Sequence, residues 1–209
     1  MDIYAALADE RRAIADRLET LTPEQWQVQS LCSAWDVKQL VSHLVVASEF
    51  TLGEALAGMV TARGNPDRLQ QVLVDKRATL SPSELIARLR ANAEARKKPP
   101  IVGILGPYTD ALVHALDLWI PLGFEDVGAP ERWRPALDFL VSRKATVGFL
   151  PKPAPDLWYQ ATDLEWQHGV GDVVSGTAAD LGLAILGRTP HLDRLDGPGA
   201  ETLRDFARR

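Results

Sequence analysis

The stretch YTDALVHALDLWIPLG, residues 108–123, sets polar side chains inside an apolar run with helical spacing. Asp110 and His114 stand four residues apart, and Asp117 follows three residues later. Residues three and four apart lie on one face of an α-helix, so these three side chains can face one neighbouring element or one ion. The spacing permits metal chelation, but an ordinary ion-paired or hydrogen-bonded couple uses the same spacing.

The composition is that of a soluble globular protein. The chain has 209 residues, of which 46% are hydrophobic and 24% are charged. A net charge of -5 disfavours nucleic acid as a partner. No signal-peptide pattern opens the sequence, and no apolar stretch reaches the roughly 20 residues that span a bilayer. The single cysteine excludes an intramolecular disulfide. We therefore expect a cytoplasmic protein without a membrane partner, and the sequence leaves a homo-oligomer open.

Helix signals extend outward from the opening stretch. Residues 2–20 have helical spacing, and SAWD at 33–36 predicts a second helix that runs into the fifties, with Ser33 as its N-cap and Asp36 completing a capping box. SPSE at 81–84 is a further capping box with proline at the first helical position.

The remaining signals define a predominantly helical fold. The helix of the opening stretch should end near Pro121 and Gly123, and a fifth helix is predicted over 130–149. The fold class expected is mainly α, with a helical bundle over residues 1–150.

The proline-rich run FLPKPAPDLWYQ, residues 149–160, favours a linker near residue 150. Beyond it, LWYQATDLEW and VVSG predict the two strands of a β-hairpin. A helix capped by Thr177 and closed by Gly187 follows, and PGAETLRDFARR predicts a last short helix. Residues 151–209 are thus expected to form a small α+β domain.

His43 is the candidate that could complete a metal site. It flanks the apolar stripe of the second predicted helix, in VSHLVVA, a position where histidines are usually packed structural residues. Helix bundles build metal centres by projecting carboxylates and histidines inward from facing helices, and His43, Asp110 and His114 fit that scheme. Two histidines and one carboxylate also suit non-haem iron.

Three blocks resemble a known family. The segment LTPEQWQVQSLCSAWDVKQLVSHLVVASEF, residues 21–50, resembles the N-terminal domain of the mycothiol-dependent maleylpyruvate isomerase family, within the DinB/YfiT-like metalloenzyme superfamily. DALVHALDLWIPLG is similar to the second block of that family, and VSGTAADLGLAILGR resembles its small C-terminal domain. The resemblance implies a DinB-like four-helix bundle whose metal ligands are His43, Asp110 and His114. Many members carry glutamate where this chain has Asp110.

The resemblance also implies a chemistry. Zinc is the metal it favours, and three protein ligands would leave open coordination positions, as in catalytic zinc sites. A thiol entering such a position would be deprotonated and held as a nucleophile. Because Cys32 is the only thiol of the chain, the family nominates mycothiol, a low-molecular-weight thiol of actinobacteria, as the cofactor.

Two classes of function follow. The first is a metal-dependent enzyme whose thiol cofactor attacks a small-molecule electrophile, by thiol transfer or isomerisation. The alternative is a non-catalytic bundle protein that uses the pocket to sense a ligand, with or without metal. A metal-free structural scaffold is a third reading, which the three matching ligand positions disfavour.

Three more residues have alternative roles. Asp117 can accept the remaining N–H of a metal-bound histidine as a second-shell residue, or it can be a surface ion pair or helix-end charge. Arg188 can bind a substrate carboxylate in bidentate fashion and so serve catalysis, or it can cap the carbonyls of the preceding helix. Cys32 reads as a small packed residue.

Overall fold

The structure is a computed structural model that describes residues 1–124 and 128–209. The chain divides into two compact units. The first comprises Met1–Lys97 and His114–Glu125, and the second comprises Lys98–Val113 and Asp126–Arg209. Within the described residues, no helix is long and apolar enough to cross a membrane.

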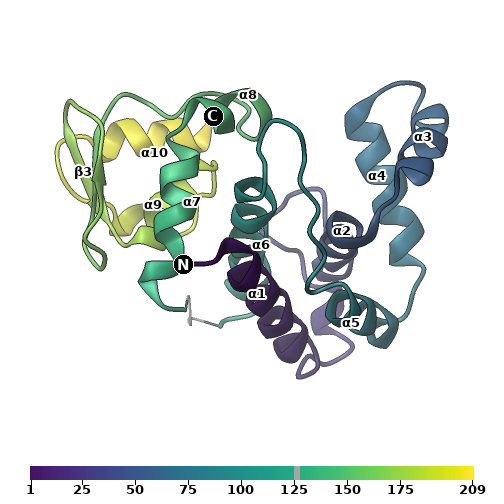
Figure 1. The fold of residues 1–209 in the computed structure, drawn as a ribbon. Coiled ribbons are helices and arrows are strands. Elements are labelled where there is room, and N and C mark those ends of the chain that lie inside the picture. Colours follow the sequence, from purple (N-terminus) through teal and green to yellow (C-terminus); the bar gives the residue numbers. More distant parts are fainter. Residues whose placement is uncertain (125–127) are drawn as a thin grey trace. The chain divides into compact units, whose positions relative to one another are not determined.

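The first unit is a helical bundle built from α1 (Ile3–Leu18), α2 (Val37–Glu49), α5 (Pro82–Ala91) and the C-terminal part of α6 (Leu105–Trp119) (Figure 1). Apolar positions at helical spacing on each of these helices meet in one core, which also takes Trp26 from the short 3₁₀ helix η1 (Gln25–Gln27). The buried core residues are Ile14, Ala15, Leu18, Trp26, Val37, Leu40, Val41, Leu44, Val45, Leu85, Ile86, Leu89, Ala115, Leu118 and Trp119.

The start of α2 corrects one sequence prediction. Asp36, and not Ser33, is the N-cap: its side chain accepts from the backbone N–H of Gln39, and the Gln39 side chain accepts from the backbone N–H of Asp36. Ser33 lies too early because Gln29 and Asp36 pair in an isolated β-bridge, which keeps the intervening residues in a loop. The capping box therefore falls three residues later than predicted.

The predicted extension of α2 into the fifties is also wrong. The helix ends at Glu49, and Thr51 caps a separate helix, α3 (Leu52–Thr61), through a capping box with Glu54. A further helix, α4 (Pro66–Ala78), packs against both α2 and α3. The sequence interpretation had assigned no separate element to either segment.

A network of ion pairs joins α4 to α2 and α3. Arg77, which is only 5% exposed, places Nε 2.9 Å from Oε1 of Glu49 and Nη1 2.9 Å from Oε1 of Glu54. Lys76 Nζ also lies 3.0 Å from Glu54 Oε1. The hydrogen bonds from Arg77 and Lys76 lower the pKa of Glu54 to about 2. This network ties α4 to the end of α2, the helix that carries His43.

The capping box over 81–84 is confirmed, since Ser81 caps α5 and Glu84 returns the bond.

In the second unit, the helix predicted over 130–149 is divided. It begins with a 3₁₀ turn, η2 (Pro130–Arg132), and continues as α7 (Trp133–Leu140) and α8 (Arg143–Gly148). Ser142 separates the two helices because its side chain caps α8.

The strands of the second unit differ from the predicted hairpin. β1 (Trp158–Ala161) pairs antiparallel with β2 (Gln167–His168) and parallel with β3 (Val173–Gly176), so the sheet order is β2-β1-β3. VVSG is therefore the parallel neighbour of β1 and not its hairpin partner. The residues that β1 buries on one face are Tyr159 and Ala161.

Helices cover the sheet of the second unit. α9 (Ala178–Ile185) contacts β1 and β3, and α10 (Ala200–Arg208) contacts β3 (Figure 1). Thr177 caps α9, as the sequence predicted, and a 3₁₀ turn, η3 (Leu192–Arg194), lies between the two helices. The fold class, mainly helical with a small α+β part, is confirmed.

The predicted division into domains 1–150 and 151–209 stays a prediction. By its contacts, the second unit contains α7 and α8 as well as the segment after residue 150. α7 packs against α9, which explains why these helices group with the C-terminal part.

Candidate metal site

Helix α6 carries three of the predicted site residues. Ala115, Leu118 and Trp119 point into the core of the first unit, which fixes the rotation of this part of the helix. His114 is 9% exposed and Asp117 is fully buried. Asp110 lies one helical turn before His114 and is half-buried.

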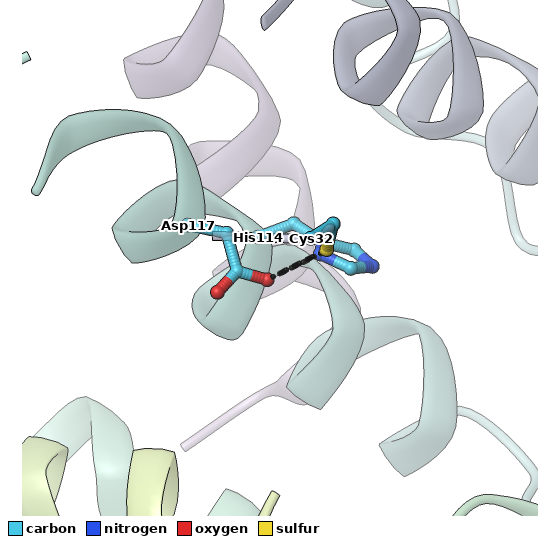
Figure 2. Close-up of side chains that lie close together, drawn as sticks. All are labelled: Cys32, His114 and Asp117. Atoms are coloured by element: carbon cyan, nitrogen blue, oxygen red, sulfur yellow. Dashed lines mark hydrogen bonds and ion pairs between the residues drawn. The ribbon is translucent and has the colours of Figure 1, made fainter. Parts of the chain in front are cut away.

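His114 is held by Asp117. Its Nδ1 lies 2.9 Å from Oδ2 of Asp117, within the same helix. The thiol of Cys32 donates to the same carboxylate oxygen at 3.2 Å, and Sγ lies 3.7 Å from Nδ1 of His114. Figure 2 shows the three side chains together, with the second ring nitrogen of His114 pointing away from Asp117. Because Nδ1 faces the carboxylate, Nε2 is the nitrogen that can coordinate an ion.

His43 lies against His114 from α2. The two imidazole rings are 5.0 Å apart between centroids and nearly perpendicular, at 80°. On another side, Trp35 stacks on the His43 ring at 5.0 Å and 24°. The amide nitrogen of Gln70, on α4, lies 3.1 Å from Nδ1 of His43. His43 is thus oriented by contacts from its own bundle and from α4.

Among the residues that the structure describes, two groups of side chains can supply ligands to one ion. In the first group, His43, Asp110 and His114 each offer a ligand atom, and these atoms lie within 4.8 Å of one another. In the second group, Cys32, His114 and Asp117 satisfy the same distance. Both groups contain His114, so either set of ligands requires this residue.

The donor chemistry fits a metal better in the first group. Two imidazoles and one carboxylate are a ligand set of three-ligand catalytic zinc sites. A metal-bound histidine usually donates its other N–H to a carboxylate, and Asp117 already stands at that position on His114. In the second group, by contrast, both the thiol and the imidazole nitrogen are engaged with Asp117.

A braced loop, residues 29–36, supports both histidines. It places Cys32 at Asp117 and Trp35 against His43. Ser30 Oγ donates to the Trp35 carbonyl at 2.6 Å, and the backbone N–H of Leu31 donates to the Asp117 carbonyl at 3.1 Å. The sequence interpretation treated Cys32 as a packed residue and missed this role. The signal was present as C-S-A-W-D-V, but no spacing rule relates that run to α6.

Arg188 lies in the second unit, immediately beyond α9. Its Nη1 donates to the carbonyl of Leu186 at 2.9 Å, which is the contact of a side chain that caps a helix end. Its backbone N–H bonds the carbonyl of Leu183. A catalytic role for Arg188 stays a prediction.

The fold and the site define a class: a mainly helical protein with a small α+β part, in which α2 and α6 bring two histidines and a carboxylate together. Residues 7–99 match the family model of the mycothiol maleylpyruvate isomerase N-terminal domain. The match covers residues 21–50, the segment whose resemblance to this family the sequence analysis described.

Solved structures agree in fold. The crystal structure of the mycothiol-dependent maleylpyruvate isomerase is similar over 95% of this chain and 92% of its own, with a TM-score of 0.56 and 13% identity. A mutant of that enzyme with one histidine replaced by alanine gives the same coverage and TM-score at 12% identity. At such identities the likeness establishes a shared fold. A search of curated proteins finds no match.

Proposed function

We propose that the chain is a metal-dependent enzyme that uses a low-molecular-weight thiol, mycothiol, to convert a small electrophile by thiol transfer or isomerisation. The observation that carries the proposal is the grouping of His43, Asp110 and His114 within 4.8 Å. The family of residues 7–99, which is named for a mycothiol-dependent isomerase domain, supports the choice of thiol.

His43, Asp110 and His114 would hold the ion, and zinc suits this donor set. When bound, zinc would act as a Lewis acid that stabilises a thiolate at the site. Neighbouring residues of the protein orient the metal ligands. Asp117 orients His114 through Nδ1, and Trp35 restrains His43 by stacking on its ring.

Trp35, which lies against His43, shapes the surroundings of that histidine. Trp35 presents an aromatic face to His43 while its Nε1 donates to Gln71 at 3.0 Å. The indole is therefore anchored at both its ring and its polar end, so it restricts the access of water to one side of His43. A restricted, partly apolar site strengthens electrostatic interactions between an ion and its ligands.

Elemental analysis is the first test. Purified protein should retain zinc, or take it up in a one-to-one ratio after reconstitution, and His43→Ala should lose most of it. His168→Ala is the matched control, because His168 is exposed on β2 and belongs to neither ligand group. Wild-type protein that binds zinc no better than His43→Ala would disprove the metal site.

Activity is the second test. The zinc-loaded protein is mixed with mycothiol and a panel of electrophiles that includes maleylpyruvate, and both thiol consumption and isomer formation are followed. Thiol consumption without isomer formation would identify a transferase, and isomer formation without net thiol loss an isomerase. Zinc binding without turnover of any electrophile would favour the sensor function over the enzyme.

A further inference from the structure

The thiol of Cys32 contacts the fully buried carboxylate of Asp117. Oδ2 of Asp117 accepts two hydrogen bonds, one from the Cys32 thiol at 3.2 Å and one from Nδ1 of His114 at 2.9 Å. The Asp117 side chain has no exposed surface, so water cannot replace a donor that is removed. A buried carboxylate that loses a donor moves or rearranges to regain one.

The position of the thiol is set by the chain around it. The backbone N–H of Leu31 bonds the Asp117 carbonyl, while the next residue, Cys32, bonds the Asp117 side chain. The backbone N–H of Cys32 is itself bonded to Ser30 Oγ at 3.2 Å. The loop therefore binds Asp117 of α6 at two points, its main-chain carbonyl and its carboxylate.

We propose that Cys32 is a positioning residue that holds the Asp117 carboxylate in the orientation that fixes the His114 imidazole. The inference deepens the proposed metal site and rests on it for its functional meaning. The terminal torsion of an aspartate is broad, so a bond to His114 does not by itself define where Oδ2 lies. The thiol supplies a further bond to the same oxygen, and it acts here as a hydrogen-bond donor.

Three substitutions of Cys32 distinguish the effect of losing the hydrogen-bond donor from the effect of losing side-chain volume. Cys32→Ser keeps a donor at this position, Cys32→Ala removes both donor and volume, and Cys32→Val removes the donor while it fills the space. Ser48→Ala is the matched control, because it deletes a buried hydroxyl of α2 that donates to Val45 and to no site residue. Thermal unfolding of each variant checks that the fold is retained.

The first readout is the imidazole of His114 in metal-free protein, followed by ¹⁵N-resolved NMR and assigned with His114→Ala. Wild type, Cys32→Ser and Ser48→Ala should show the tautomer that carries its proton on Nδ1. Cys32→Val and Cys32→Ala should show a mixture of the two tautomers, because the carboxylate no longer has a single orientation.

The second readout is the dissociation constant for zinc, measured by competition with a chelator. Cys32→Val and Cys32→Ala should weaken binding by roughly 10-fold, the lower end of what supporting residues contribute, while Cys32→Ser stays near wild type.

Unchanged zinc affinity together with an unchanged His114 tautomer in Cys32→Val would overturn the proposal, as would Cys32→Ser behaving like Cys32→Val. If wild-type protein binds no zinc at all, the proposed function fails, and the tautomer measurement alone decides the role of Cys32.

Discussion

Replacing Asp117 by asparagine removes the charge behind His114 and keeps the shape of the side chain. The bond between Nδ1 and Oδ2 is buried, and its length of 2.9 Å is that of a charge-assisted hydrogen bond. Bonds to charged groups contribute about 1.5–3 kcal/mol, and about 1.4 kcal/mol corresponds to a tenfold change in affinity. We therefore expect Asp117→Asn to weaken zinc binding by roughly 10–100-fold.

The assay is competition for zinc against a chromophoric chelator at a fixed pH, with His43→Ala as the reference for loss of a direct ligand. Asp138→Asn is the matched control. Asp138 accepts a 2.8 Å bond from Trp166 Nε1 in the second unit, so the change removes a charged hydrogen-bond acceptor that belongs to neither ligand group. If Asp117→Asn binds zinc as tightly as wild type while His43→Ala does not, then Asp117 does not support His114 as argued.

Three further predictions concern other contacts. Arg188→Lys should impair turnover with little loss of thermal stability if Arg188 grips an anionic substrate, because lysine lacks the planar fork; equal activity with a lower melting temperature would assign it to the helix cap. Arg77→Met should lower the free energy of unfolding in urea by about 3 kcal/mol, because Glu49 and Glu54 each lose a buried partner. The lowered pKa of Glu54, about 2, means that its contribution is present above its unfolded pKa near 4.3 and is lost as the pH falls towards 2. After allowance for solvent screening, wild type should exceed Glu54→Gln in unfolding free energy by about 1 kcal/mol at pH 7, and urea titrations near pH 2 should show no difference.

Local signals explain which helices could be predicted. The capping box of Ser81 and Glu84 is complete within four residues, so no tertiary contact was needed to place α5. Thr51 and Glu54 form the same motif, yet the second helix was predicted to run into the fifties, where the next apolar positions are Leu52 and Leu56. Their side chains are 76% and 63% exposed, so the periodicity there does not mark a buried face.

Non-local pairing explains most of the errors. Both Ser33 and Asp36 are suitable N-caps by residue type, and the choice between them depends on a β-bridge with Gln29. The parallel pairing of β3 with β1 likewise depends on contacts that α9 and α10 make with the sheet. Strand propensity carries no information about direction.

The residues of the candidate site likewise differ in whether local sequence could predict their contacts. Asp110 and His114 share a helix, so their proximity follows from spacing alone. His43 became a candidate because helix bundles build metal centres from facing helices, and the family resemblance then named it as a ligand; no local rule relates α2 to α6. Cys32 had neither support: its bond to Asp117 joins residues 85 positions apart and depends on how the loop over 29–36 folds.

The discontinuity of the first unit has a consequence for the order of events during synthesis. Ala115, Leu118 and Trp119 complete the core of α1, α2 and α5, but they are translated only after Lys98–Val113, which belong to the other unit. At about 5–20 residues per second, the 28 residues from Lys97 to Glu125 take roughly one to six seconds to add. For that interval the apolar faces of three finished helices lack their fourth partner, so the nascent chain exposes a binding surface for chaperones just before the bundle can close.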